Sequence, residues 1–146
     1  MNAAATLELQ RTARLVLCHK QATSARVRFL SLNNSILAFD PVDGEVRLHD
    51  DGYAPEVTVH PSAVIRQAQA RLGLGEGSVA AEPGFRAWLA TDDGDVPVLL
   101  AVFDTTDPPF DAAERIGARF IAMTDARRLP PVDQQLLRRV YEHLLG

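Results

Sequence analysis

The stretch that decides the fold runs from residue 26 to 60 and reads RVRFLSLNNSILAFDPVDGEVRLHDDGYAPEVTVH. Apolar runs alternate in it with turn dipeptides, of which Asp43-Gly44 and Asp51-Gly52 are the clearest. Asp-Gly is favoured in tight turns between strands because glycine adopts positive φ freely and aspartate hydrogen-bonds to its own backbone. A third pair, Asp93-Gly94, lies further along the chain. The pattern predicts short antiparallel strands.

Four strands of a β-meander are predicted in this stretch, at 26–32, 35–40, 45–49 and 56–60. Asn33-Asn34 suits the first, two-residue turn. If each loop is symmetric, apolar residues of neighbouring strands lie side by side and form a continuous row. That row consists of Leu30, Leu37, Leu48 and Val57. One face of the sheet is therefore predicted to be core, and the other to be only partly covered.

Helical patterns follow in three places. Ser62 is predicted to cap the first helix, and Gly73 comes just past its end. Asp107 is predicted to cap a short helix that Gly117 closes. A C-terminal helix is predicted to begin at Pro131, because proline is favoured in the first helical turn.

The remaining predicted strands are 85–90, 98–103 and 119–124. The first two form a hairpin whose loop is 91–95. Residues 3–19 favour a helix slightly, and 15–18 could equally form a strand. The sequence thus predicts a single α+β domain over 1–146. Its antiparallel meander forms one sheet layer, packed with three to four helices mainly on one face.

Composition narrows the class of protein. The chain has 146 residues and a formal net charge of −4, which argues against nucleic acid as the main partner. A lone cysteine, Cys18, excludes a disulfide within the chain and fits a reducing cytoplasm. The start of the chain does not resemble a signal peptide, and the apolar run 96–103 is too short to cross a bilayer. Arginine is abundant and Lys20 is the only lysine, which is typical of a bacterial genome rich in G and C. Together these features predict a bacterial, cytoplasmic protein without membrane contact.

No catalytic residue, cofactor or metal site is predicted. Cys18 and His19 resemble a nucleophile and its base, but neighbours in a strand point to opposite faces. His49 and His60 lie at opposite ends of a predicted hairpin. Strand rise separates them by about 13 Å, too far to share one zinc ion.

The polar segment Asp104-Thr105-Thr106-Asp107 follows the most apolar strand and precedes a helix. Binding crevices often form where strand ends meet helix N-termini, and buried carboxylates there can act as acid and base. In the alternative interpretation, Asp107 is only a helix cap and the loop is structural. The candidate ligand-binding residues are Asp104, Asp107, Trp88 and Arg119.

Three functions are consistent with these patterns. The leading prediction is a non-catalytic domain that binds a small molecule or a protein partner. The alternative is an enzyme that acts on a polar small molecule, with Asp104 and Asp107 as acid and base. In a third interpretation, an anionic ligand binds to a group of arginines near the N-terminus. These are Arg11, Arg14, Arg26 and Arg28.

A homodimer is also predicted. In the C-terminal helix, apolar residues span an arc of about 220°, whereas one-sided packing needs about 100°. They are Val132, Leu136, Leu137, Val140, Tyr141, Leu144 and Leu145. A wider apolar surface than packing on the sheet requires usually indicates contact with another protein chain, most often a second copy related by a twofold axis.

Overall fold

The computed structural model describes residues 13–40, 42, 44–56 and 59–146. Its strands are β1 (Arg14–Lys20), β2 (Val27–Ser31), β3 (Arg47–Leu48), β4 (Val79–Ala81), β5 (Ala87–Thr91), β6 (Gly94–Phe103) and β7 (Arg119–Ile121). Its helices are α2 (Ser62–Leu72), α3 (Phe110–Arg115), the 3₁₀ helix η1 (Met123–Arg128) and α4 (Pro131–Leu145). The fold is α+β, as predicted, with seven described strands in one mixed sheet. No described helix has the length and apolar character needed to span a membrane.

The sheet is mixed because β1 lies parallel to β6, with Arg14 opposite Val98 and Cys18 opposite Val102. The strand order is β3-β5-β6-β1-β2-β7, and β4 pairs with the later part of β6. All the other strand pairs are antiparallel. The prediction of a purely antiparallel sheet is therefore wrong at its central pair. Parallel neighbours need a long connection, and short-range turn signals do not reveal such a pairing.

The first described segment is a strand, which decides between the two alternatives for residues 14–19. All five residues from Leu15 to His19 are buried. A continuous buried run suits a strand that is covered on both faces, and this burial outweighs the helix propensity of the segment. Residues 3–12 lie outside the described part of the chain.

The described residues of 26–60 do not form the predicted four-stranded meander. Asn33 and Asn34 do make the predicted turn, with φ of 53° and 58°, and Leu32 pairs with Ser35. The chain does not continue along β2, because β1 and β7 occupy the two edges of that strand. Residues after the turn cross to β1 instead, where Leu37 forms a bridge with Val16.

The predicted apolar row is also wrong. β3 pairs with β5, so Leu48 lies opposite Leu89. Leu30, in β2, lies opposite Phe120 of β7. Val57 lies outside the described residues, and the described residues of the expected strand 56–60 are not in a strand. The turn dipeptides indicate where the chain reverses direction. Which strands pair depends on the burial of apolar residues from segments that are distant in the sequence.

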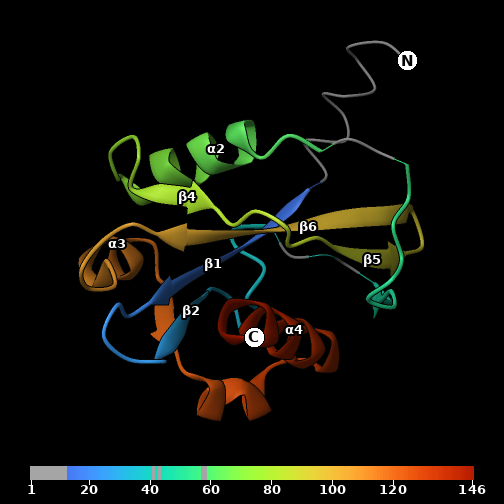
Figure 1. Cartoon of the computed structure of the whole chain (residues 1–146). Helices are drawn as coiled ribbons and strands as arrows, with labels where there is room; N and C mark the ends of the chain where they lie inside the picture. The colour runs from blue at the N-terminus through green and yellow to red at the C-terminus, as the bar shows by residue number, and fades with distance from the viewer. Residues whose placement is uncertain (1–12, 41, 43, 57–58) are drawn as a thin grey trace.

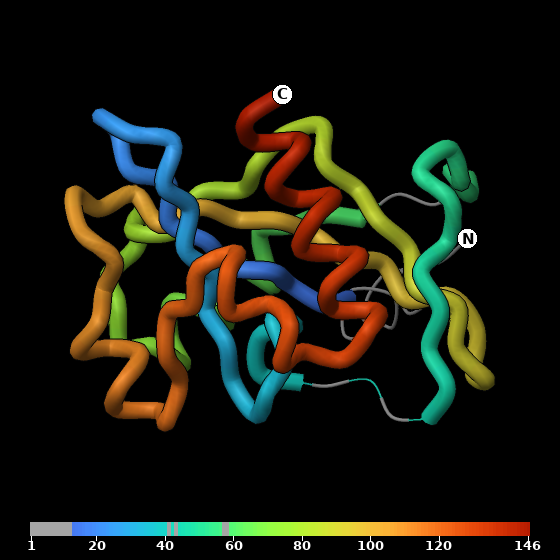
Figure 2. The backbone as a smooth tube through the Cα atoms, turned by 90° about the horizontal axis from the view of Figure 1, so that it is seen from below, coloured from blue at the N-terminus to red at the C-terminus, as the bar shows by residue number. Residues whose placement is uncertain are grey.

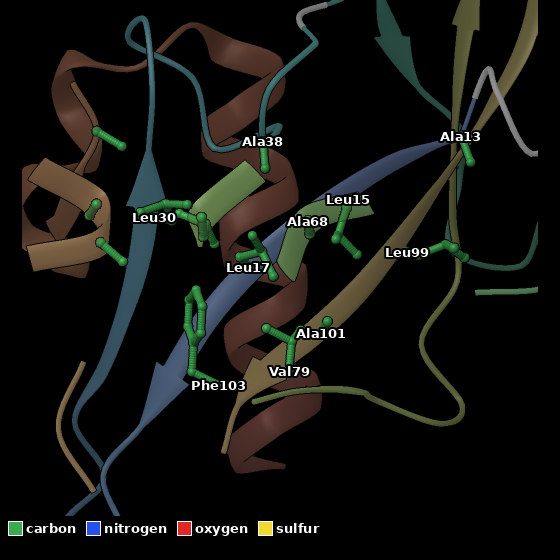
Figure 3. Packing of buried hydrophobic residues seen from close by; sticks show 14 of the residues in the cluster. Ala13, Leu15, Leu17, Leu30, Ala38, Ala68, Val79, Leu99, Ala101 and Phe103 are labelled. Carbon is green, nitrogen blue, oxygen red and sulfur yellow. The ribbon is translucent and has the colours of Figure 1, made fainter. Parts of the chain in front are cut away.

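Helices cover both faces of the sheet, contrary to the prediction of one face. Figure 1 shows α2 on one side and α4 on the other, and Figure 2 shows α4 lying across the strands when seen from below. Leu15 and Leu17 of β1 belong to the apolar cluster of the α2 side, part of which is seen in Figure 3. Val16 and Cys18, the alternate residues, belong to the cluster of the α4 side. Because successive side chains of a strand point to opposite faces, β1 contributes apolar residues to the clusters on both sides of the sheet.

Helix positions were predicted better than helix caps. α2 spans the predicted residues and ends at Gly73, whose φ of 68° is the left-handed conformation that glycine favours. However, Ser62 lies inside α2, after an N-cap at Pro61, and makes no capping bond. Pro109 occupies the N-cap of α3, so Asp107 is not its cap. α4 begins at Pro131, as predicted.

The second hairpin is confirmed with a tighter turn. Thr91 pairs with Gly94, so only Asp92 and Asp93 lie between β5 and β6. β4 and β5 both lie on the edge of β6 that faces away from β1. Residues 82–86 connect them and leave the ladder, forming an irregular segment on that edge. β7 ends at Ile121 rather than at 124, because η1 follows it.

A buried carboxylate connects α4 to the segment after β2. Asp133 is 3% exposed, and its Oδ2 accepts hydrogen bonds from the Ser35 hydroxyl at 2.7 Å and the Ile36 N–H at 2.9 Å. The Ser35 hydroxyl oxygen also accepts from the N–H of Leu37 at 3.1 Å. The N-terminus of α4 and the start of the segment that reaches β1 are therefore held together.

Asp133→Ala should lower the free energy of unfolding by about 2 to 3 kcal/mol, because it leaves two buried donors without their charged acceptor. Asp133→Asn should cost less, since the amide oxygen can still accept from both groups. Urea unfolding measures both changes. The control is Asp107→Ala, which removes an exposed side chain and should change stability by less than about 0.5 kcal/mol. A larger loss for Asp107→Ala than for Asp133→Ala would contradict this account.

Candidate functional site

The four residues predicted as a ligand site lie apart on the fold. Trp88 is buried in β5 opposite Pro97, whereas Asp104 follows the far end of β6. Strand rise separates these two positions by roughly 20 Å. Asp104 and Asp107 are exposed on one loop, and Arg119 is exposed on β7. Asp104 and Asp107 thus share one loop, and Trp88 lies at the other end of β6.

The predicted separation of Cys18 and His19 agrees with their different partners. The Cys18 thiol lies 3.8 Å from the carbonyl oxygen of Ala101, while His19 Nε2 lies 2.8 Å from the carbonyl oxygen of Thr105. Burial, with a smaller contribution from the charge of Glu82, raises the pKa of Cys18 to about 12. The thiol therefore stays protonated near neutral pH and is a poor nucleophile.

The arginines near the N-terminus do not form one group in the described structure. Arg14 begins β1, while Arg28 lies opposite His19 near the other end of that strand. Five residues of strand separate the two levels, or about 16 Å. Arg28 lies over the ring of Phe110 instead, at 5.7 Å from its centre. Arg11 lies outside the described residues.

A different site is formed where three distant segments meet in a cleft of about 260 Å³. The segments are the loop after β3, the irregular segment between β4 and β5, and the second half of α4. The lining residues are Asp51, Gly84, Phe85, Arg86, Arg139, Glu142 and His143. The cleft thus combines two guanidinium groups and an imidazole with two carboxylates and one aromatic ring.

Both arginines of the cleft are held by contacts that use only part of their hydrogen-bonding capacity. Arg139 donates from Nη2 to the carbonyl oxygen of His49 at 3.1 Å, and its Nε lies 3.8 Å from Oδ1 of Asp51. Arg86 donates from Nη1 to the carbonyl oxygen of Val59 at 3.4 Å. A guanidinium group has five N–H donors, and these contacts with described residues use one or two of them on each arginine.

The side chain of His143 is positioned by contacts on two sides. Its Nε2 lies 3.5 Å from Oε1 of Glu82, and its ring packs edge-on against Phe85 with the centres 5.5 Å apart. The backbone of Gly84 passes close by: a Cβ there would lie 3.7 Å from the imidazole Cε1. Gly84 also has a φ of 81°, a conformation that other residues rarely adopt. This glycine lets the irregular segment turn beside the imidazole.

The loop that carries Asp51 is anchored to the β5–β6 hairpin through Asp95. His49 Nε2 lies 2.8 Å from Oδ1 of Asp95, and the Tyr53 hydroxyl donates to Oδ2. The His49 and Tyr53 rings stack with their centres 3.8 Å apart, and Tyr53 meets Trp88 edge-on. Because both ends of the loop bind one carboxylate, Asp51 between them is held at the rim of the cleft.

These bonds shift two pKa values in opposite directions. The hydrogen bond from Tyr53, followed by that from His49, lowers the pKa of Asp95 below its ordinary 3.8. Hydrogen bonding to Asp95 raises the pKa of Tyr53 above its ordinary 10.0, since the phenol is bonded in its protonated form.

Sequence reasoning missed the cleft, although one signal was available. Arg139, Glu142 and His143 have the i, i+3 and i+4 spacing that places side chains on one helical face. The sequence places His49 at a predicted strand end and Asp95 in a predicted hairpin loop. Their pairing joins segments that are far apart in the chain, so local patterns could not reveal it. Among the described residues, no group of three His, Cys, Asp or Glu side chains is placed to hold a metal ion.

The shifted pKa values predict how stability depends on pH. The bonds to ionised Asp95 should stabilise the fold above pH 3.8, and this contribution should be lost as pH falls through the lowered pKa. The bond from protonated Tyr53 should stabilise the fold below pH 10.0 and be lost as pH rises through the raised pKa. In a carbon-detected NMR titration, Tyr53→Phe should move the pKa of Asp95 back toward 3.8. An unchanged Asp95 titration in that variant would contradict the assignment.

Comparison with known proteins assigns no family to the chain. Neither a protein-family model nor a curated protein sequence matches it. The geometry of the cleft and the chemistry of its residues are therefore the grounds for a functional proposal.

Proposed function

We propose that the protein is a non-catalytic binding domain whose ligand is a small molecule with a carboxylate or phosphate group, held in the cleft between α4 and the segment after β4. The observation that carries this proposal is the convergence of Arg86, Arg139 and His143 on one cleft. A guanidinium fork matches the geometry of carboxylate and phosphate oxygens and binds them through paired, charge-assisted hydrogen bonds.

The volume of the cleft and the charges on its lining limit the size and the charge of the ligand. Its volume of about 260 Å³ is close to the lower end of ligand sites, which range over roughly 300 to 1,000 Å³, so the ligand is small. Phe85 supplies an apolar wall beside the arginines. Asp51 and Glu142 lie on the same lining and would repel an extended polyanion. These carboxylates, with the net charge of −4, favour a compact anionic group over nucleic acid.

The residues of the cleft favour binding over catalysis. Cys18 is buried within the sheet and does not line the cleft, and burial raises the pKa of its thiol to about 12. His49 uses Nε2 to bind Asp95 and stacks on Tyr53, which suits an anchoring role. An enzyme with Asp104 and Asp107 as acid and base stays an untested prediction. Both of these side chains are exposed on the loop after β6.

The proposal is tested with phosphate and propionate as probes, followed by amide NMR shifts at pH 7. Both anions should shift residues of the cleft, and methylammonium should not. Arg86→Gln should weaken phosphate binding about tenfold or more, because it removes a charged donor without touching the Arg139 contacts. The matched control is Arg66→Gln on the exposed part of α2. Absence of shifts in the cleft, or equal weakening by Arg66→Gln, would overturn the proposal.

Cytoplasmic location, bacterial origin and a homodimer stay predictions. The chain itself buries Leu136, Leu137 and Val140, so a dimer formed through α4 would use its partly exposed end. Light scattering should then give about twice the chain mass of 15.9 kDa at micromolar concentration. Tyr141→Glu should weaken the assembly, since Tyr141 is partly exposed. A monomer under these conditions would show that the apolar residues of α4 are covered within one chain.

A further inference from the structure

A second cavity, of about 420 Å³, lies at the N-terminus of α4, whereas the cleft lies along the second half of that helix. Its wall is largely apolar. The apolar residues that line it are Leu37, Val42, Val46, Pro130, Pro131 and Val132. A charged residue, Asp133, lines the same cavity while being only 3% exposed. Burying a charged carboxylate in an apolar cavity raises the free energy of the fold unless the carboxylate is paired or hydrogen-bonded. The groups that already bind it therefore determine which ligand the cavity can hold.

The hydrogen bonds from the described residues engage one of the two oxygens of that carboxylate. Both hydrogen bonds to Asp133, from the Ser35 hydroxyl and the Ile36 N–H, go to the same oxygen, Oδ2. Within the described part of the chain, Asp133 forms no salt bridge. An ionised carboxylate has about four acceptor sites on its two oxygens. Oδ1 therefore has acceptor capacity for a donor that enters the cavity.

The start of α4 disfavours an anion here. Helix N-termini bind anions through free backbone N–H groups, but Pro130 and Pro131 have none. The carboxylate of Asp133 already provides the negative charge that the first turn favours. A second anion would be repelled at short range, whereas a cationic donor would complete the pairing of Asp133.

We propose that this cavity binds a small organic amine. Its ammonium group donates to Oδ1 of Asp133, and its apolar body packs against Leu37, Val46 and Val132. The inference is independent of the anion site, because no described residue lines both cavities.

Cyclohexylamine and cyclohexanol are suitable probes, since they share a ring and differ in charge at pH 7. Binding is followed by amide NMR shifts, and we expect both probes to shift Ser35, Leu37 and Val132. The ammonium form should bind about tenfold tighter than the alcohol or better, as expected for a hydrogen bond to a charged group. Asp133→Asn should abolish that preference while leaving the affinity for cyclohexanol nearly unchanged. The control Asp125→Asn, at an exposed carboxylate of η1, should change neither affinity.

A second variant keeps the test decisive if Asp133→Asn does not fold. Val46→Phe places a larger side chain in the cavity and should weaken both probes about tenfold. Equal affinity for the two probes in the wild-type protein would overturn the proposal. So would an ammonium preference that survives Asp133→Asn, or unchanged amine binding in Val46→Phe. Phosphate binding in the cleft should be the same in all three variants, so that failure of one site is distinguishable from failure of the other.

Discussion

The structure depends on the burial of β1 on both of its faces. This strand lies between β6, to which it is parallel, and β2, to which it is antiparallel. Leu15 and Leu17 pack toward α2, while Val16 and Cys18 pack toward α4. Removing such a strand would expose both apolar clusters at once, and each fully buried leucine or valine contributes about 1.5 to 3 kcal/mol. The continuous apolar run of β1 also agrees with the two helical layers, since a strand covered on both faces needs apolar residues on both.

α4 is the element that carries both proposed sites. Leu136, Leu137 and Val140 are buried on the sheet, which determines the orientation of the helix and the direction of its remaining side chains. At its N-terminus, Asp133 binds the segment after β2. Farther along, Arg139 binds the loop after β3 through the carbonyl of His49. Two loops without regular pairing are thus positioned by one helix, and each forms one wall of a cavity.

The ionisable side chains of α4 follow the helix dipole, and the two proposed sites differ in charge. Asp133 lies in the first turn and His143 in the last, the arrangement that stabilises a helix through its partial terminal charges. The side chains that complement the dipole are also the groups that line the cavities. A carboxylate therefore faces the cavity at the start of α4, and two arginines with an imidazole face the cleft along its second half. α4 thus contributes residues to both proposed sites, and other segments of the chain complete each of them.

Local features of this protein were determined by the sequence alone. The Asn33-Asn34 turn, the β5–β6 hairpin, the end of α2 at Gly73 and the start of α4 at Pro131 follow from backbone preferences of a few adjacent residues. The predicted helix caps are wrong: Pro61 occupies the N-cap of α2 in place of Ser62, and Pro109 occupies the N-cap of α3 in place of Asp107. Only the tertiary structure decided that β1 joins β6, that helices cover both faces, and that Arg86, Arg139 and His143 share a cleft. The physical reason is that these pairings are selected by the burial of surfaces from distant segments, a free energy that no single stretch of the chain contains.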